Sequence, residues 1–317
     1  MNSTKRAAVY KALAQQVIDG LENNEVPWRK TWNSKGTGKL YNIMSGWKYS
    51  GFNKFNLGFA MAINGYTSNG FITFKAASEL GANVKKGSRG IKVVFWKEES
   101  PEDFADRWIK WDKEGREGSE PYPYSDPFYS TVFNLDAIEF DPERPLPAAV
   151  LRNMAKNTPT SEEVENFNAI ESAEEIVSHY LAQNPALKFS NKGGDRACYS
   201  PSSDAVMMPA PEDFESPDNY YQVTFHELGH STGHKSRTGR LSEDRSELAP
   251  FGSADYSKEE LVAELTSLFV SSEARIELTI ENSTAYIKNW LTVLKNDPSM
   301  VINAAGKAQK AADYILR

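Results

Sequence analysis

Three of the four histidines of this 317-residue chain fall within nine residues, in the segment HELGHSTGH at positions 226–234. The segment contains the pattern H-E-x-x-H. On a helix, residues four apart lie on the same face, so His226 and His230 can bind one metal ion through their imidazole nitrogens. Glu227 lies beside them, where a carboxylate can take a proton from a metal-activated water. The motif predicts a metal hydrolase. The competing interpretation is a solvated helix that carries these residues by chance.

The flanking sequence predicts where the helix of this motif begins and ends. Residues 216–218, Ser-Pro-Asp, supply an N-cap residue, a first-turn proline and a first-turn acid in the positions that each prefers. Tyr221, Phe225 and Leu228 then recur at helical spacing and predict a buried face distinct from the face with the two histidines. Gly233 suits the end of the helix. We therefore expect the motif late in a helix of about four turns.

A catalytic zinc site usually takes three protein ligands and leaves a fourth position to water. The nearest acid-rich segment is YSKEELVAE at positions 256–264, which is expected to open a second helix. Its Glu260-x-x-Ala-Glu264 pattern resembles the third-ligand helix of gluzincin metallopeptidases, in which the first acid binds zinc and the second orients a ligand histidine. Glu260 is the predicted third ligand, with Glu264 as an alternative ligand or a support for one. The competing interpretation is a capping box, with Ser257 as N-cap and Glu260 at N3.

Two further residues near the motif are candidates for supporting roles. His234 follows the expected helix-breaking Gly233, so it is predicted to support the site or the following loop instead of binding the metal. Tyr256 lies close to Glu260 in sequence and is a candidate for holding the oxyanion of a reacting carbonyl.

Cysteine usage and hydropathy indicate the compartment. The single cysteine, Cys198, has no partner for an intramolecular disulfide and excludes a cysteine-rich metal site. Residues 1–22 lack the apolar core of a signal peptide and instead predict an amphipathic helix capped by Ser3 or Thr4. No stretch approaches the length of a transmembrane helix. We therefore expect a cytoplasmic protein without a membrane partner.

The charge of the chain is unevenly distributed. The whole sequence has a formal net charge of −7, yet residues 1–97 hold 15 lysines and arginines against 4 acidic residues. The remainder of the chain is strongly acidic. This asymmetry favours a front half that binds nucleic acid and an acidic back half that carries the enzymatic site.

Aromatic and basic residues are interleaved in the front half. Single-stranded nucleic acid is bound with little sequence preference by rings that stack on bases and cations that contact phosphates. The candidate contacts are Trp28, Arg29, Lys30, Trp32, Trp47, Lys48, Tyr49, Lys85, Lys86 and Arg89. Lys85, Lys86 and Arg89 are favoured as phosphate contacts, because they flank a glycine turn that precedes an expected strand. The competing interpretation places the rings in the core beneath a solvated basic face.

Composition changes along the chain suggest a division into two domains. Residues 1–140 form the first expected domain, and within it residues 98–127, rich in acids, glycine and proline, are predicted to be a mobile insertion between two strands. The proline-containing segment 141–164 is predicted to be the linker. Residues 165–317 form the second domain, which the pattern predicts as a helix, three short strands near 187–189, 197–199 and 205–208, and then the two metal-bearing helices. This order of elements along the chain, a small sheet followed by two metal-bearing helices, is similar to that of zincins.

The motifs together resemble the ArdC-type antirestriction proteins of conjugative plasmids, which are similar to the N-terminal part of plasmid TraC primases. The resemblance spans nearly the whole chain. It rests on the segments 27–32, 41–53, 80–87, 133–134, 226–234 and 259–264. The acidic segment 98–127 is not readily matched to the family pattern.

The resemblance implies an α+β fold: an N-terminal mixed α+β domain that binds single-stranded DNA, followed by a zincin-like metallopeptidase domain. It also implies protection of incoming plasmid or mobile-element DNA from host restriction. The expected cofactor is Zn²⁺, with another divalent metal as an alternative, and the expected partners are single-stranded DNA and an unknown protein substrate.

Three rival functions remain open at the level of sequence. The chain could coat single-stranded DNA and use its metal site only structurally, although a purely structural site needs no general base such as Glu227. Its acidic half could mimic DNA and titrate restriction enzymes, although dispersed acids on helices are more often a solvated surface. The peptidase could instead act on proteins bound to DNA.

Overall fold

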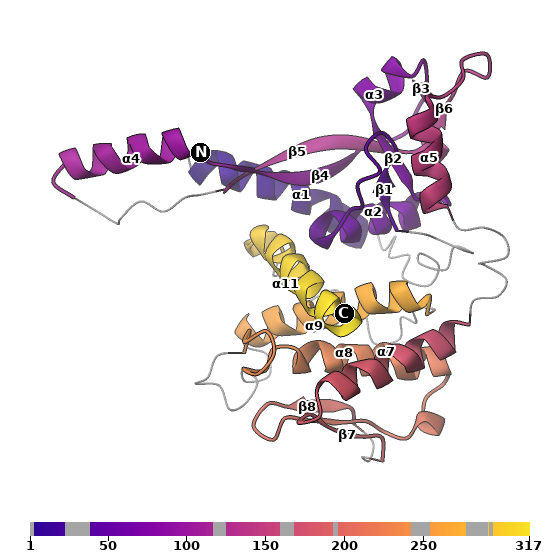
Figure 1. Ribbon diagram of the computed structural model, residues 1–317, viewed down its shortest axis with the longest axis vertical. Coiled ribbons are helices and arrows are strands. Elements are labelled where there is room, and N and C mark those ends of the chain that lie inside the picture. Colours follow the sequence, from indigo (N-terminus) through magenta and orange to yellow (C-terminus); the bar gives the residue numbers. More distant parts are fainter. Residues whose placement is uncertain are drawn as a thin grey trace.

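The structure is a computed structural model (Figure 1). It describes residues 3–22, 39–116, 125–158, 168–192, 196–241, 254–276, 291 and 294–317. The chain is α+β, as predicted, with an N-terminal half built around a four-stranded sheet and a mostly helical C-terminal half (Figure 1). Among the described residues, no helix has the length and apolar character needed to cross a membrane.

The N-terminal sheet has the strand order β1-β2-β5-β4, in which β1 (Tyr41–Asn42) and β2 (Gly70–Thr73) are parallel and the other pairs antiparallel. The last two strands, β4 (Ile91–Glu98) and β5 (Ser125–Asn134), form a long hairpin that extends well beyond the short strands (Figure 1). Ile91, Val93 and Val132 share one face of this hairpin and are almost fully buried. Alternation of side chains across the pleat therefore gives the hairpin a core-facing side.

Two helices cover the open edge of β4, and their polar side chains satisfy its backbone. These helices are α1 (Ser3–Glu22) and α2 (Gly51–Asn64). The Asn53 amide accepts from Val94 N and donates to Val94 O, both at 2.7 Å, while Gln16 Oε1 accepts from Lys92 N at 3.1 Å. An edge strand otherwise leaves unpaired donors and acceptors that invite another chain. The predicted N-terminal helix is thus confirmed, and it protects a sheet edge. It already includes Ser3 and Thr4, so the interpretation of either residue as its cap is wrong.

Small elements complete the N-terminal half: α3 (Phe74–Glu79), β3 (Asn83–Val84), η1 (Leu135–Ala137) and β6 (Ile138–Glu139), with β3 and β6 paired antiparallel. Two helices lie in segments where the sequence predicted none. Helix α4 (Pro101–Lys113) occupies much of the expected insertion 98–127, because Ser100 caps it and acids and lysines occupy its first and last turns. Helix α5 (Ala148–Asn157) lies within the expected linker 141–164.

Helix α5 packs on the N-terminal half. Val150 is buried in a cluster with Tyr41 and Ile72, and Asn153 Nδ2 donates to the Ile43 carbonyl at 3.0 Å. The part of the expected linker that forms α5 is therefore an ordered layer on the first domain. The surrounding prolines are typical of a linker, whereas the signal for a helix in this segment is its short apolar face.

The C-terminal half begins with α7 (Ala169–Gln183) and a small sheet of order β7-β9-β8, made of β7 (Lys188–Ser190), β8 (Cys198–Ser200) and β9 (Ala205–Met207). These strands lie within a residue or so of the three predicted ones. A short turn, η2 (Pro211–Asp213), leads to α8 (Pro217–Ser231), followed by α9 (Ala254–Ala274) and α11 (Ser299–Leu316).

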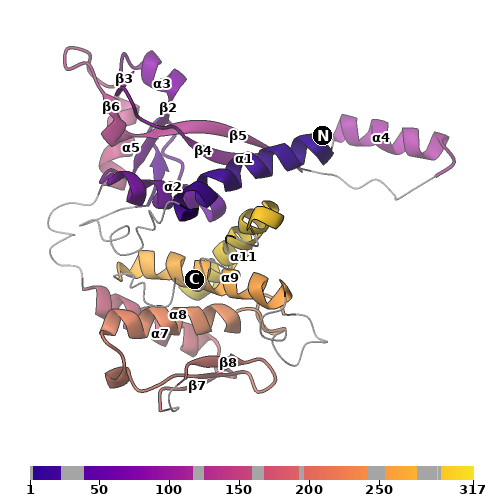
Figure 2. The same cartoon turned by 180° about the vertical axis from the view of Figure 1, so that it is seen from behind.

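Helix α11 joins the two halves. It contacts α8 and α9 on one side and α1 and α2 on the other, and lies between them in both views (Figures 1 and 2). Its buried face is made largely of alanine, including Ala305 and Ala308, which lets neighbouring helices approach closely. One continuous apolar cluster accordingly includes Leu13 of α1, Phe55 of α2 and Phe269 of α9. The N-terminal half has two apolar clusters of its own, but the apolar faces of α1 and α2 are buried together with the C-terminal helices.

Candidate functional site

Helix α8 presents the two histidines of the H-E-x-x-H motif side by side. Ser216 begins the helix as predicted, with its Oγ accepting from Asn219 N at 3.2 Å. Phe225 and Leu228 are fully buried, which fixes the rotation of the helix. His226 and His230 then lie on another face, with their Nε2 atoms 3.1 Å apart. The local helical geometry that the motif predicts is confirmed.

Helix α9 packs across α8 at the glycine of the motif. A Cβ built on Gly229 would lie 3.3 Å from the Ala263 Cα and 3.2 Å from the Thr266 Cβ, so a larger residue would push the helices apart. This close approach brings the Glu260 carboxylate to 3.5 Å from His226 Nε2 and 3.4 Å from His230 Nε2. One donor atom from each of the three residues lies within 4.8 Å of the others, so the group could hold a metal ion.

The outer nitrogens of both histidines face two other carboxylates of α9. His226 Nδ1 lies 3.1 Å from Glu264 Oε2, and His230 Nδ1 lies 3.3 Å from Glu259 Oε1. Carboxylates in these positions hold a ligand histidine in the tautomer that leaves Nε2 free for a metal. Glu260 is therefore the acid that faces both Nε2 atoms, whereas Glu264 touches the far side of one ring.

Sequence reasoning missed Glu259 and its partner Arg240. The guanidinium of Arg240 donates to both oxygens of Glu259, at 2.9 and 2.6 Å, and to the carbonyl of Gly229 at 2.9 Å. Arg240 thus ties the start of α9 to the motif helix. Glu259 directly precedes Glu260 in the sequence, and this pair of acids was the signal from which its role could have been predicted. Arg240 lies 19 residues earlier in the sequence and gave no signal of its own.

Charge at this cluster favours a cation. Burial by itself would lower the pKa of His226 and of His230, but their hydrogen bonds to the glutamates outweigh it, and the pKa of each rises above its ordinary value. Burial conversely would raise the pKa of the carboxyls, yet the two histidines hold the pKa of Glu260 well below its usual range. His230 and Arg240 likewise lower the pKa of Glu259 to about 2. The carboxylates thus stay ionised around two imidazoles.

Glu227 is only 8 % exposed and follows His226 on α8. Its negative charge also contributes to the raised pKa of His226 and His230, after the burial and hydrogen bonds described above. The donor set of two imidazoles and one carboxylate is one that catalytic zinc uses with an open fourth position. A buried carboxylate next to such a set is suited to general-base chemistry.

The other residues predicted near the motif lie elsewhere. His234 comes after the end of α8, and its Nδ1 lies 2.8 Å from Ser236 Oγ and 3.9 Å from the Asp204 carboxylate. It belongs to the loop after α8, one of the two roles expected for it. Helix α9 begins at Ala254, so the interpretation of Ser257 as its N-cap is wrong. Tyr256 lies in the first turn of α9, but its side chain is outside the described residues.

The predicted nucleic-acid contacts divide into three groups. Trp47 is 73 % exposed, and Lys48, Lys85, Lys86 and Arg89 are exposed as well. Residues 27–32, with Trp28, Arg29, Lys30 and Trp32, lie outside the described residues. Tyr49 is a correction: it is only 7 % exposed and its ring packs edge-on against Phe71, so it offers no free face to a base.

Family comparisons match the two halves separately. A model described as the N-terminal domain of anti-restriction factor ArdC matches residues 7–133, and a model described as a zincin-like metallopeptidase matches residues 173–307. A Sinorhizobium fredii protein named y4eC, of uncharacterised function, is 30 % identical over 312 residues, covering 97 % of this chain and 91 % of its own.

Longer relatives and solved structures match nearly the whole chain. Two DNA primases named TraC from Escherichia coli are 34 % and 31 % identical over 99 % and 97 % of this chain. The chain spans only 20 % and 27 % of their lengths. Crystal structures of the antirestriction protein ArdC from plasmid R388 superpose with TM-scores of 0.64 for the Mn(II)-bound form and 0.63 for the metal-free form. They are 26 % and 28 % identical and match 97 % of this chain and 96 % of theirs.

Proposed function

This chain belongs to the ArdC-type antirestriction family, and from that premise we propose that it binds single-stranded DNA and hydrolyses peptide bonds with a divalent metal. In this proposal residues 1–140 carry most of the DNA binding and residues 165–317 form the metallopeptidase domain. The biological role would be protection of incoming plasmid or mobile-element DNA from host restriction. The observation that carries the enzymatic part is the convergence of His226, His230 and Glu260 next to the buried Glu227.

His226, His230 and Glu260 would hold the metal. Zn²⁺ is the proposed ion because two imidazoles and one carboxylate suit it, while the related R388 protein has been crystallised with Mn(II). When bound, such an ion supplies a Lewis acid that polarises a carbonyl and makes water a stronger acid.

Glu227 is the proposed general base. Its carboxylate would accept a proton from the attacking water and later deliver that proton to the nitrogen of the leaving amine. Because Glu227 is buried, few water molecules other than the attacking one can hydrogen-bond to its carboxylate. Tyr256 remains a proposed support for the oxyanion, on the basis of its position in the first turn of α9.

Glu264 and Glu259 are proposed positioning residues. Each would accept a hydrogen bond from the Nδ1–H of one histidine, so that both Nε2 lone pairs face the same point. Arg240 would act one step further out, because its two hydrogen bonds hold the Glu259 carboxylate against His230.

Arg240→Ala is expected to weaken metal affinity by about 10–100-fold, the usual effect of losing an outer support of a ligand histidine. Arg240→Lys should recover little, because an ammonium group cannot reproduce a bidentate contact. The measurement is competition with a chromogenic chelator, together with the melting temperature of the metal-free protein. If Arg240→Ala lowered only that melting temperature and left affinity unchanged, Arg240 would serve the fold alone.

The proposal for DNA binding rests on the match to the ArdC N-terminal domain and on the exposed tryptophan and cations of the first half. The residues proposed as contacts are Trp28, Arg29, Lys30, Trp32, Trp47, Lys48, Lys85, Lys86 and Arg89. Of the three cations in the β3–β4 turn, Lys85 also donates from Nζ to the Asp136 carbonyl at 2.8 Å, which orients it along the turn.

Binding of the full-length protein to an oligonucleotide is expected to weaken steeply with salt. For single strands the log–log slope is about −0.7 per phosphate neutralised, so replacing Lys85, Lys86 and Arg89 together by alanine should flatten it by about 2. Fluorescence anisotropy across a salt series measures this slope. A slope unchanged in the triple variant would remove the β3–β4 turn from the DNA surface.

A second candidate function keeps the DNA binding but makes the metal site structural, so that protection is a coating of the strand. The buried Glu227 argues for catalysis, since a structural site needs no general base. An assay of whether Glu227→Gln protects single-stranded DNA from restriction separates the two functions. If this variant still protected single-stranded DNA from restriction, protection would be coating and the peptidase would have another purpose.

A further inference from the structure

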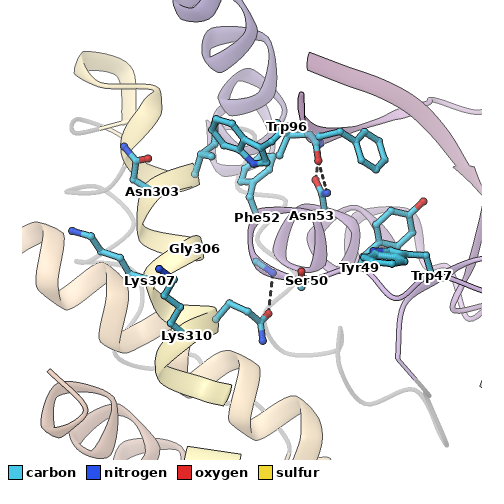
Figure 3. A pocket seen from close by; sticks show the side chains of 15 residues that line it. Trp47, Tyr49, Ser50, Phe52, Asn53, Trp96, Asn303, Gly306, Lys307 and Lys310 are labelled. Carbon is cyan, nitrogen blue, oxygen red and sulfur yellow. Dashed lines mark hydrogen bonds between the residues drawn. The ribbon is translucent and has the colours of Figure 1, made fainter. Parts of the chain in front are cut away.

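A groove of about 870 Å³ lies where the two halves meet, between the start of α2, strand β4 and helix α11. Residues 47, 49–53 and 94–96 form the N-terminal side, and α11 forms the other side with Ile302, Asn303, Gly306, Lys307, Gln309 and Lys310. Figure 3 shows Trp47 and Trp96 on the first side and Lys307 and Lys310 on the helix across from them. The metal-site residues are not among these lining residues.

The N-terminal side of the groove offers aromatic surface. Trp47 is 73 % exposed and Trp96 is 46 % exposed, whereas large apolar side chains in this fold are otherwise mostly buried. Trp96 rests against Tyr10 of α1 with ring centroids 6.4 Å apart, which holds the indole in place. Exposed tryptophans that line a groove commonly mark a binding surface.

The helical side of the groove is basic. Lys307 and Lys310 are both exposed on α11. Among the described residues that line the groove, none is acidic, although the whole chain has a formal net charge of −7. The one acid of α11, Asp313, accepts a hydrogen bond from Gln309 Nε2 at 2.8 Å and is not among the lining residues. The local charge therefore suits an anionic chain.

The two sides of the groove are tied together before any ligand arrives. Gln309 Oε1 of α11 accepts a hydrogen bond from the backbone N of Gly51 at 2.9 Å. Within the N-terminal side, Asn53 of α2 bonds both backbone groups of Val94 in β4. Gly51 has φ +54, a backbone conformation that favours glycine, and a Cβ there would lie in ordinary van der Waals contact with the Ala305 carbonyl of α11, at 3.7 Å. A groove built in this way needs little ordering on binding.

We propose that this groove binds a segment of single-stranded DNA, with bases stacked on Trp47 and Trp96 and phosphates facing Lys307 and Lys310. The inference rests on the proposed single-stranded DNA binding and adds that the last helix of the metallopeptidase half supplies part of the surface. Rings opposite cations are the combination that such binding uses. A duplex is a poorer occupant because its bases are stacked on one another, and an acidic peptide would leave the indoles without stacked partners.

The test measures binding of the full-length protein to a fluorescein-labelled oligo(dT) by anisotropy over a salt series. Lys307→Ala/Lys310→Ala should flatten the log–log salt slope by about 1.4, for two lost phosphate contacts. The matched control is Lys188→Ala/Lys192→Ala, which removes the same charge from the same half but at the small sheet, and it should leave the slope unchanged. Trp96→Ala should lose about 5–150-fold in affinity at a nearly constant slope.

The outcomes separate the two levels of the proposal. A wild-type protein that does not bind oligo(dT) would overturn single-stranded DNA binding and, with it, this inference. Wild-type binding with both lysine pairs behaving alike would overturn only the groove. Equal affinity for a duplex and for the single strand would also overturn the proposal that DNA binds in this groove. Because Lys307 and Lys310 are exposed, their variant keeps the test decisive even if Trp96→Ala fails to fold.

Discussion

Glu227→Gln is expected to keep its bound metal and to lose about 10²–10⁴-fold in peptide hydrolysis, the usual contribution of a general acid–base residue. The amide has nearly the same shape as the carboxylate but cannot accept the proton of water. The two histidines and Glu260 are unaltered, so metal binding should persist. Elemental analysis and cleavage of a fluorogenic casein, each with and without an oligonucleotide, measure the two properties.

The matched control for this variant is Glu175→Gln, which makes the same chemical change at an exposed position of α7. It should retain both metal and activity. Full hydrolysis by Glu227→Gln would assign the base to another residue. Loss of metal together with activity would instead make Glu227 part of the metal-binding group.

His226→Ala/His230→Ala is expected to lose most of its bound metal, because two of three proposed protein ligands are gone. Glu260→Ala should behave in the same way, since its carboxylate faces both Nε2 atoms. Glu264→Ala and Glu259→Ala should weaken affinity by only about 10–100-fold, because each of these carboxylates meets a histidine at its outer nitrogen and not at Nε2. Elemental analysis after dialysis, followed by chelator competition, ranks the variants.

Full metal content in the double histidine variant would show that these residues do not hold the metal. A larger loss in Glu264→Ala than in Glu260→Ala would exchange the roles of the two acids. Glu175→Ala again provides a control, because it removes one exposed carboxylate without touching the cluster.

The N-terminal half, to which we assign most of the proposed DNA binding, packs against the C-terminal half. Leu13, Ala14 and Val17 of α1 are buried in the cluster that includes α9 and α11. A fragment of residues 1–140 would expose this apolar face to water, so measurements on the full chain are the appropriate ones. The same packing is why α11 could contribute to a surface that the sequence assigns to the first half alone.

Local patterns in the sequence determined much of the architecture of the site. The four-residue spacing of His226 and His230, the Ser-Pro-Asp start at 216–218 and the apolar positions of α8 are properties of one helix, so they could be predicted without knowing its neighbours. The amphipathic α1 and the short strands of the second half were predictable for the same reason. Each of these features depends on residues close together in the sequence, through helical or strand periodicity or through a capping position.

Only the tertiary structure decided which acid faces the histidines and which rings face solvent. Spacing allowed both Glu260 and Glu264, and the close crossing of α8 and α9 at Gly229 brings the carboxylate of Glu260 to within 3.5 Å of both Nε2 atoms. The Arg240–Glu259 contact and the burial of Tyr49 against Phe71 likewise depend on elements distant in sequence. The groove beside α11 exists because a helix near the C-terminus packs on α2, and such packing leaves no periodic signal in either segment.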